Sequence, residues 1–130
     1  MYKKYTINTY YLNISKIDIL NMTTEAKSVI LETFGESPFI KVLDFFLTYP
    51  SFDYSKTQVA DEIGISRITI EKIWKQLIKR EIIVKTRTIG KAEMYQLNRE
   101  NPRVKILMKI GLELSSSYFE EVKHKIAIPA

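Results

Sequence analysis

The sequence predicts a mainly α fold with a small β-hairpin, an α+β class, and three features of the chain support this. Two short apolar-periodic segments on either side of Gly64 are typical of helices joined by a tight turn. Two β-prone runs, IIVKTRT and AEMYQL, are joined by residues 89–91, as in a hairpin. A helical pattern resumes after Pro102. The chain has 130 residues, 45% of them hydrophobic, so it is expected to fold around one core.

The first third of the chain is expected to hold an N-terminal arm and two helices. Within residues 1–23, apolar and polar side chains alternate, which predicts a strand or an extended arm. A short helix is predicted within residues 24–34, and Gly35 is placed to end it. Ser37 can cap a second helix that begins at Pro38. This second helix is apolar on nearly every side and is therefore expected to be the central buried helix.

Two further helices are predicted after a brief strand or connector at residues 51–54. Ser55 can cap the first of them, and Gln58 is placed to complete a capping box. Gly64 follows the last apolar position, where a left-handed backbone ends a helix without a Cβ penalty. Ser66 can cap the second helix. The apolar positions recur at helical spacing and are predicted to share one core: Val59, Ala60, Ile63, Ile70, Ile73 and Leu77, with Ile65 directed inward between the helices.

This order of residues resembles the helix-turn-helix motif, which presents its second helix to a DNA groove. The hairpin that follows it resembles the wing of a winged helix-turn-helix domain. The run from about residue 39 to 114 resembles the winged helix-turn-helix transcriptional regulators common in archaea. The expected parts are an N-terminal arm or strand at 1–23, a DNA-binding domain at 24–100 and a C-terminal helix at 101–130.

The positive charge of the chain agrees with this resemblance. There are 20 lysines and arginines against 15 aspartates and glutamates, a formal net charge of +5. Residues 56–103 hold eleven basic and six acidic residues, whereas the rest of the chain holds nine of each. The whole excess therefore lies on the segment that resembles a DNA-binding unit, as neutralisation of phosphates requires.

The resemblance implies a recognition helix at residues 66–80 in the major groove, and a wing at 82–98 on the DNA backbone or in the minor groove. Recognition helices contact bases mainly through their N-terminal residues. Arg67 is therefore predicted to contact a guanine, and Ile68 or Thr69 a thymine methyl. The predicted DNA-binding residues are Thr57, Gln58, Ser66, Arg67, Ile68, Thr69, Lys72, Lys75, Lys85, Arg87 and Lys91.

Some of these residues also have a purely structural interpretation. Lys72 and Lys75 suit phosphates or a guanine, but they also suit a solvated helix face. A helix cap accounts for Gln58 as well as a phosphate contact does. Lys85 and Arg87 are predicted to share one strand face, because side chains alternate along a strand, so both are expected to point at DNA.

The pattern after Pro102 is long and apolar, and it is predicted to form the seam of a homodimer. Helix-turn-helix proteins read paired half-sites through two-fold symmetry, which favours this interpretation. The alternative is an intramolecular cover over Phe45 and Phe46. The apolar positions of this helix are Val104, Leu107, Met108, Leu112 and Leu114.

Other classes of protein fit the sequence less well. The chain has one histidine, His124, and no cysteine, and it lacks a phosphate-cradling glycine loop and a metal-spaced cluster, so no enzyme, metal or cofactor is predicted. Without a signal-like apolar run or a membrane-spanning stretch, a cytoplasmic chain is expected. Two alternatives remain: a winged-helix module that binds a protein of the transcription or replication machinery, and an architectural protein that binds DNA by charge alone.

Overall fold

The computed structural model describes residues 28–126, which form five helices and a three-stranded antiparallel sheet. The predicted α+β class is therefore confirmed for this part of the chain. The arm predicted at residues 1–23 and the start of the helix predicted at 24–34 lie outside the described residues. In chain order the elements are α2 (Val29–Phe34), α3 (Pro38–Thr48), β1 (Tyr54–Ser55), α4 (Lys56–Ile63), α5 (Arg67–Lys79), β2 (Ile83–Ile89), β3 (Ala92–Leu97) and α6 (Pro102–Ile126).

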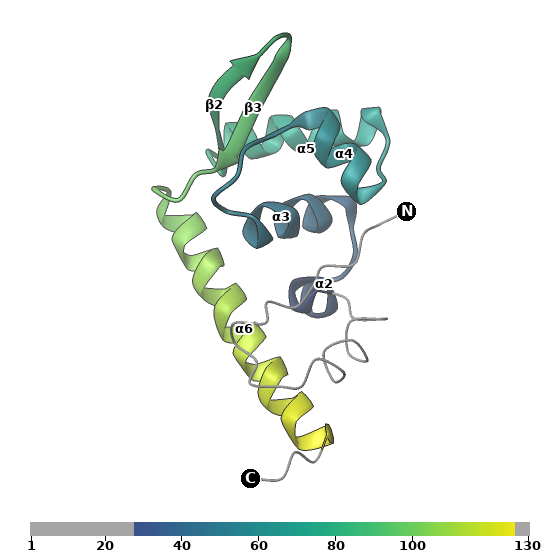
Figure 1. Ribbon diagram of the computed structural model, residues 1–130, viewed down its shortest axis with the longest axis vertical. Helices are drawn as coiled ribbons and strands as arrows, with labels where there is room; N and C mark the ends of the chain where they lie inside the picture. Colours follow the sequence, from purple (N-terminus) through teal and green to yellow (C-terminus); the bar gives the residue numbers. More distant parts are fainter. Residues whose placement is uncertain (1–27, 127–130) are drawn as a thin grey trace.

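These elements are stacked along the long axis of the molecule (Figure 1). The hairpin of β2 and β3 projects at one end, α4 and α5 lie next to it, and α3 and α2 follow. Helix α6 starts near the base of the hairpin and runs past α2 toward the opposite end. The hairpin and the C-terminal half of α6 therefore lie at opposite ends of the described chain.

Helix α3 begins at the residue that the sequence indicates, and α2 ends at the predicted Gly35; within the described residues α2 begins at Val29. Ser37 accepts a hydrogen bond from the Ile40 N–H at 3.3 Å, and Pro38 occupies the first helical position of α3. Gly35 ends α2 with φ of 92°. Ser28 caps α2 and also donates a 2.7 Å hydrogen bond to Asp44, a buried residue of α3, so it ties the two helices together.

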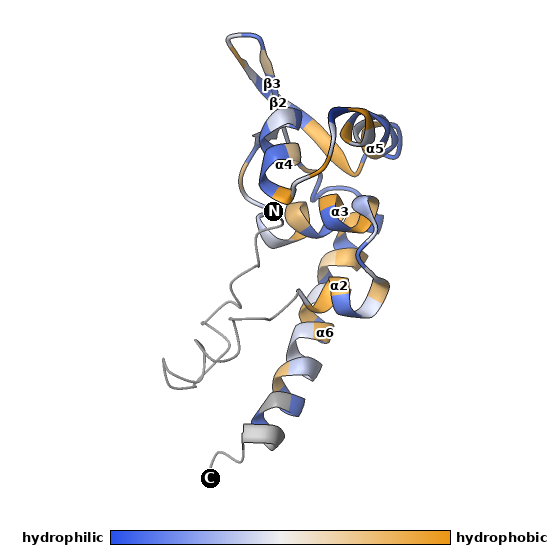
Figure 2. Ribbon diagram, turned by 90° about the vertical axis from the view of Figure 1, so that its right-hand side faces the viewer, coloured by the Kyte–Doolittle hydropathy of each residue, from blue (hydrophilic) through white to orange (hydrophobic). Residues whose placement is uncertain are grey.

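The core lies where α3, α4, α5, the sheet and the start of α6 meet. The Phe46 and Trp74 rings pack with their centroids 5.6 Å apart, and Trp74 also contacts Tyr95 at 5.5 Å. Figure 2 shows hydrophobic and hydrophilic residues alternating around α5, as expected of a helix with one buried face. The buried cluster consists of Val42, Leu43, Phe45, Phe46, Val59, Ala60, Ile63, Ile70, Ile73, Trp74, Leu77, Ile82, Ile83, Leu97 and Val104.

The two helices around Gly64 form as predicted. Ser55 and Gln58 make both hydrogen bonds of a capping box at the start of α4. Gly64 ends α4 in the left-handed region, with φ of 73° and ψ of 42°, and its N–H donates to Ala60. Ser66 then caps α5. Since the turn spans only residues 64–66, the two helices pack closely and share the core.

The sheet has the strand order β1–β3–β2. The two residues of β1 pair with Tyr95 and Met94 of β3, which joins the connector before α4 to the hairpin. The hairpin closes through Gly90, whose φ of 60° favours a residue without a Cβ. The predicted hairpin is confirmed, and the brief strand predicted at residues 51–54 is found at Tyr54–Ser55.

The register of the hairpin contradicts the prediction that Lys85 and Arg87 share a strand face. Lys85 lies opposite Tyr95, whereas Arg87 lies opposite Met94, the neighbouring residue of β3. Adjacent residues of a strand point to opposite faces. The register shifts between Lys85 and Arg87, which leaves Thr86 as an extra residue. The prediction is wrong because strict alternation fails at a β-bulge.

Helix α6 packs against both α2 and α3. Val104 is fully buried, and Leu107 and Met108 pack against the core. Leu112, by contrast, is 53% exposed. One side of α6 thus covers the core of its own chain, and another side is exposed. None of the helices within residues 28–126 is long and apolar enough to cross a membrane.

Candidate nucleic-acid interface

The exposed face of α5 carries three of the six charged residues predicted to bind DNA. Ile70, Ile73, Trp74 and Leu77 bury the opposite face of this helix. Because residues three and four apart lie on the same side of a helix, the outward side is a continuous stripe. This stripe, which we call the α5 face, consists of Arg67, Ile68, Lys72 and Lys75, all of them exposed.

The neighbouring carboxylate of α5, that of Glu71, forms its ion pair with Lys56 of α4 and not with a cation of the α5 face. Within residues 28–126, no ion pair involves Arg67, Lys72 or Lys75. Ile68 is 73% exposed, the largest exposed fraction among the large apolar side chains that are exposed within residues 28–126. The α5 face therefore presents one apolar group among three cations to any partner.

The N-terminus of α5 is fixed by its cap. The Ser66 hydroxyl accepts from the Thr69 N–H at 3.2 Å, and the two hydroxyl oxygens lie 2.9 Å apart. Ser66 and Thr69 were both predicted to bind DNA, and the structure shows their side chains hydrogen-bonded to each other. Their effect is to hold the first turn of α5, which carries Arg67 and Ile68, in one geometry.

Gln58, at the start of α4, is likewise hydrogen-bonded within a helix cap. Its Oε1 accepts from the Ser55 N–H at 2.8 Å, and its own N–H donates to the Ser55 hydroxyl at 3.2 Å. Gln58 therefore fills the capping role that the sequence left open for it. Thr57, its neighbour, is exposed.

An ion pair that the sequence analysis did not predict joins the two helices. Lys56, the first residue of α4, donates to the carboxylate of Glu71 on α5. The hydrogen bond from Lys56 lowers the pKa of Glu71 below its ordinary value. This pair neutralises one cation of the basic segment and fixes the start of α4 against α5.

In the hairpin, Arg87 is bound by a carboxylate. Its Nε and Nη2 donate to the two oxygens of Asp53 at 2.8 and 3.1 Å, and Thr86 donates to the same carboxylate at 2.6 Å. The hydrogen bond from Arg87, followed by that from Thr86, lowers the pKa of Asp53 to about 2. Arg87 is thus held toward the loop before β1, a contact that the sequence analysis missed because Asp53 lies 34 residues away along the chain.

The other two hairpin cations, Lys85 and Lys91, are held less firmly by carboxylates than Arg87 is. Lys85 lies 3.5 Å from Glu93, at the outer range of an ion pair between two half-exposed side chains, which is a weak interaction. Lys91 lies in the turn beside Gly90 and is exposed, and no ion pair within the described residues involves it. The tip of the hairpin therefore carries one unneutralised cation.

The structure brings together Arg67, Ile68, Lys72 and Lys75 on one helix face, and it holds Arg87 apart from them through Asp53. Within residues 28–126 no group of three histidine, cysteine, aspartate or glutamate side chains is arranged to hold a metal ion. Comparison of the chain with protein-family models, with curated proteins and with solved structures gives no match.

Proposed function

We propose that this chain is a sequence-specific, double-stranded DNA-binding transcriptional regulator with a winged helix-turn-helix fold. Helices α4 and α5 are the helix-turn-helix, and the hairpin of β2 and β3 is the wing. The three-residue turn at 64–66, with its left-handed Gly64 and its Ser66 cap, supports this assignment. So does the position of the hairpin directly after α5.

The observation that carries the proposal is the α5 face. Arg67, Lys72 and Lys75 are exposed and not paired with carboxylates of the described chain, while the opposite face of the same helix is buried. Thirteen residues of helix are about 20 Å long, and the major groove is about 12 Å wide, which admits one helix. A helix held by its buried face and charged on its exposed face suits this groove.

The two residues at the start of α5 have distinct tasks in this proposal. The planar guanidinium of Arg67 can donate two hydrogen bonds to a guanine, which is the commonest specific contact in the major groove. Ile68 is exposed and apolar, so it suits the methyl group of a thymine. Thr69 is bonded to Ser66 through its hydroxyl, which favours Ile68 over Thr69 for the thymine contact.

In this proposal the wing contacts the phosphate backbone of the DNA and does not distinguish bases. Lys91 at its tip is the hairpin cation best placed to meet a phosphate, because neither an aspartate nor a glutamate of the described chain pairs with it. Arg87 forms an ion pair with Asp53, and in this proposal the pair holds the hairpin in place against the loop before β1. Lys85 stays a predicted phosphate contact.

We also propose that α6 joins two copies of the chain. Ile106 and Ile110 are 59% and 37% exposed and lie four residues apart, on one face of α6 that the described chain leaves uncovered. A two-fold pair of such faces would bury these isoleucines and present two α5 faces to paired half-sites.

The experiment that tests this function is selection of bound duplexes from a random DNA pool at near-physiological salt. Winner and scrambled duplexes are then compared at two salt concentrations. A palindromic winner bound about 10³-fold or more above scrambled DNA is the expected result. Binding without enrichment, with affinity set by salt alone, would indicate an architectural protein. No binding at all would indicate a protein-interaction module.

A further inference from the structure

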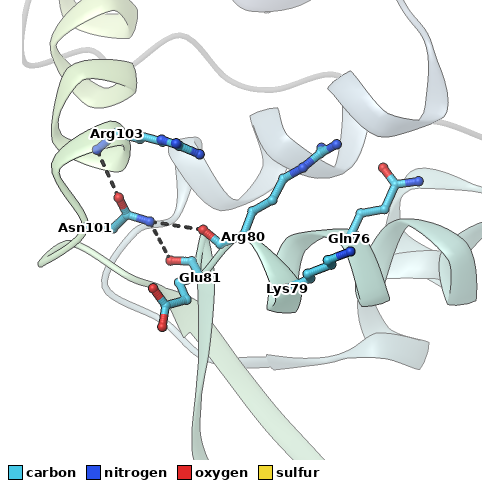
Figure 3. Close-up of a pocket in the computed structure, with 6 residues that line it drawn as sticks. All are labelled: Gln76, Lys79, Arg80, Glu81, Asn101 and Arg103. Carbon is cyan, nitrogen blue, oxygen red and sulfur yellow. Dashed lines mark hydrogen bonds between the residues drawn. The ribbon is translucent and has the colours of Figure 1, made fainter.

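A hollow of about 560 Å³ lies at the far end of α5, away from Arg67. It is formed by the last turns of α5 and the first turn of α6 (Figure 3), and its residue Lys79 lies four positions after Lys75, next to the α5 face. This volume falls within the range of about 300 to 1,000 Å³ that small ligands occupy in proteins. Its lining residues are Gln76, Lys79, Arg80, Glu81, Asn101 and Arg103.

The charge of this hollow is unbalanced. Three of its six residues are cations and one is an acid, and the Glu81 carboxylate points away from the ends of the Arg80 and Arg103 side chains (Figure 3). Within residues 28–126 no ion pair involves Lys79, Arg80 or Arg103. Cations that gather without a counter-charge attract an anion of two or more negative charges.

Asn101 builds the wall of the hollow and joins the two helices. Its amide Nδ2 donates to the carbonyl oxygens of Arg80 at 3.2 Å and Glu81 at 2.9 Å, and its Oδ1 accepts from the Arg103 N–H at 3.0 Å. Asn98 also donates to the Glu81 carbonyl at 3.0 Å. The carbonyls of the two residues that follow α5 are therefore occupied by amides, and their partial negative charge is less able to repel an anion in the hollow.

Arg80 follows the last residue of α5, whereas Arg103 belongs to the first turn of α6. The Arg80 guanidinium lies 5.7 Å from the centre of the Phe39 ring, which restricts its position. The Arg103 side chain extends from the first turn of α6 over the same hollow (Figure 3). Two guanidinium groups and one ammonium group can share the oxygens of one phosphate group, since guanidinium binds phosphate through two parallel hydrogen bonds.

We propose that this hollow is a phosphate-binding site, in which Lys79 at the end of α5, Arg80 directly after it and Arg103 of α6 hold a phosphate monoester or a diphosphate. A phosphate monoester carries about 1.5 to 2 negative charges at pH 7, which matches the excess of two positive charges in the lining. A bound phosphate bridges α5 to α6, and thereby links the helix of the α5 face to the C-terminal helix. The site rests on residues outside the α5 face, so it does not depend on the proposed reading of DNA.

Calorimetric titration of the full chain with sodium pyrophosphate, at fixed ionic strength and without DNA, tests the site. The expected result is saturable binding of one pyrophosphate per chain. Arg103→Gln and Lys79→Gln should each weaken it about tenfold or more, because each removes a charged hydrogen-bond donor from an exposed position. The matched control is Arg99→Gln, which removes the same charge from an exposed residue outside the hollow and should change the affinity less than about twofold.

Two results would overturn the proposal. One is the absence of saturable binding to the unaltered chain. The other is an equal loss in Arg99→Gln and Arg103→Gln, which would mean that pyrophosphate senses only the overall charge. Because this titration contains no DNA, either failure leaves the proposed reading of DNA standing.

A second arm identifies the source of the phosphate. If the phosphate belongs to the DNA backbone, Arg103→Gln should weaken binding to every duplex alike, and pyrophosphate should compete with DNA. If it belongs to a free ligand, Arg103→Gln should bind DNA as the unaltered chain does. Both results support a phosphate site, and they differ only in what supplies the phosphate.

Discussion

Arg67 and Lys91 are both exposed cations without carboxylate partners in the described chain, but the proposal gives them different tasks. Arg67 lies at the first position of α5, where a cap holds the backbone in place. Lys91 lies in a turn at the end of a projecting hairpin. A side chain on a fixed helix can discriminate bases, whereas a lysine at a turn offers a point charge to any phosphate.

Arg67→Ala should therefore cost roughly 1 to 3 kcal/mol of binding free energy on the selected duplex and relax the preference at one base pair. Lys91→Ala, which serves as the control for loss of charge, should weaken all duplexes alike. Dissociation constants on the selected duplex and its single-base variants measure both effects. Uniform weakening by Arg67→Ala would show that Arg67 does not read a base.

Asp53 is a second residue whose environment predicts a measurable effect. Its pKa is lowered from 3.8 to about 2 by the hydrogen bonds from Arg87 and Thr86. Since the pKa in the folded chain lies below that in the unfolded chain, the carboxylate contributes stability that is fully present above about pH 4. That contribution is lost as the pH falls toward 2.

Asp53→Asn should accordingly lower the free energy of unfolding at pH 6, and its difference from the unaltered chain should shrink between pH 4 and pH 2. Urea unfolding across this range measures the difference. Asp61→Asn, at an exposed position of α4, is the matched control and should show a smaller effect at pH 6. A difference for Asp53→Asn that stays constant with pH would show that the carboxylate does not act through its charge.

At the scale of the elements, the end of α5 is held in a strained conformation. Glu81 has φ of 55°, the only residue other than glycine with a positive φ among those described. Its N–H donates to Ile78, and the N–H of Ile82 donates to Leu77, both at 2.9 Å, which closes the helix end. Glycine is the usual residue at such a position, because a side chain there costs about 1 kcal/mol or more.

Glu81→Gly should for this reason raise the free energy of unfolding by about 0.5 to 1 kcal/mol. Glu81→Ala is the control, since it removes the same carboxylate but keeps a Cβ, and it should give no comparable gain. Thermal or urea unfolding of the two variants distinguishes relief of strain from loss of charge. Equal stabilisation by both would assign the effect to the carboxylate.

The elements themselves could be predicted because their signals are local. The capping box at Ser55, the left-handed Gly64 and the Ser66 cap each depend on residues within four positions of one another. The contacts that shape the candidate interface are not local. Lys56 meets Glu71 across 15 residues, and Asp53 meets Arg87 across 34, so neither pair follows from periodicity or capping.

The bulge in the hairpin shows a different reason for a failed prediction. Strict alternation assumes that every residue of β2 pairs in turn, but Thr86 is skipped between Lys85 and Arg87. No glycine or proline lies within β2 to mark the bulge. The bulge sets the face of Arg87, and its guanidinium there reaches Asp53, which only the folded chain brings close.

At the scale of the whole molecule, α6 has two roles that lie on different parts of one helix. Val104, Leu107 and Met108 belong to the core or pack against it. Ile106 and Ile110 face outward. Truncation before Pro102 would remove a fully buried valine and would thus disturb the fold together with any dimer, so substitutions on the exposed face test the dimer more cleanly.

The double variant Ile106→Glu and Ile110→Glu should be a monomer at concentrations where the unaltered chain is a dimer, because charges at the seam repel and are costly to bury. Sedimentation measures the mass of each. Leu112→Glu changes an equally exposed residue on another face of α6, and it should leave the dimer intact. A dimer that survives the double variant would place the seam elsewhere.

The central claim is that the α5 face binds DNA, and backbone NMR spectra of the labelled full chain, recorded with and without the selected duplex, test it most directly. The account predicts that amide signals shift at residues 66–75 and at the hairpin tip, 89–91, and not along α2. A scrambled duplex should produce smaller shifts in the first group and similar shifts at the tip. Shifts confined to α2 and α6, with the signals of 66–75 unchanged, would contradict the account.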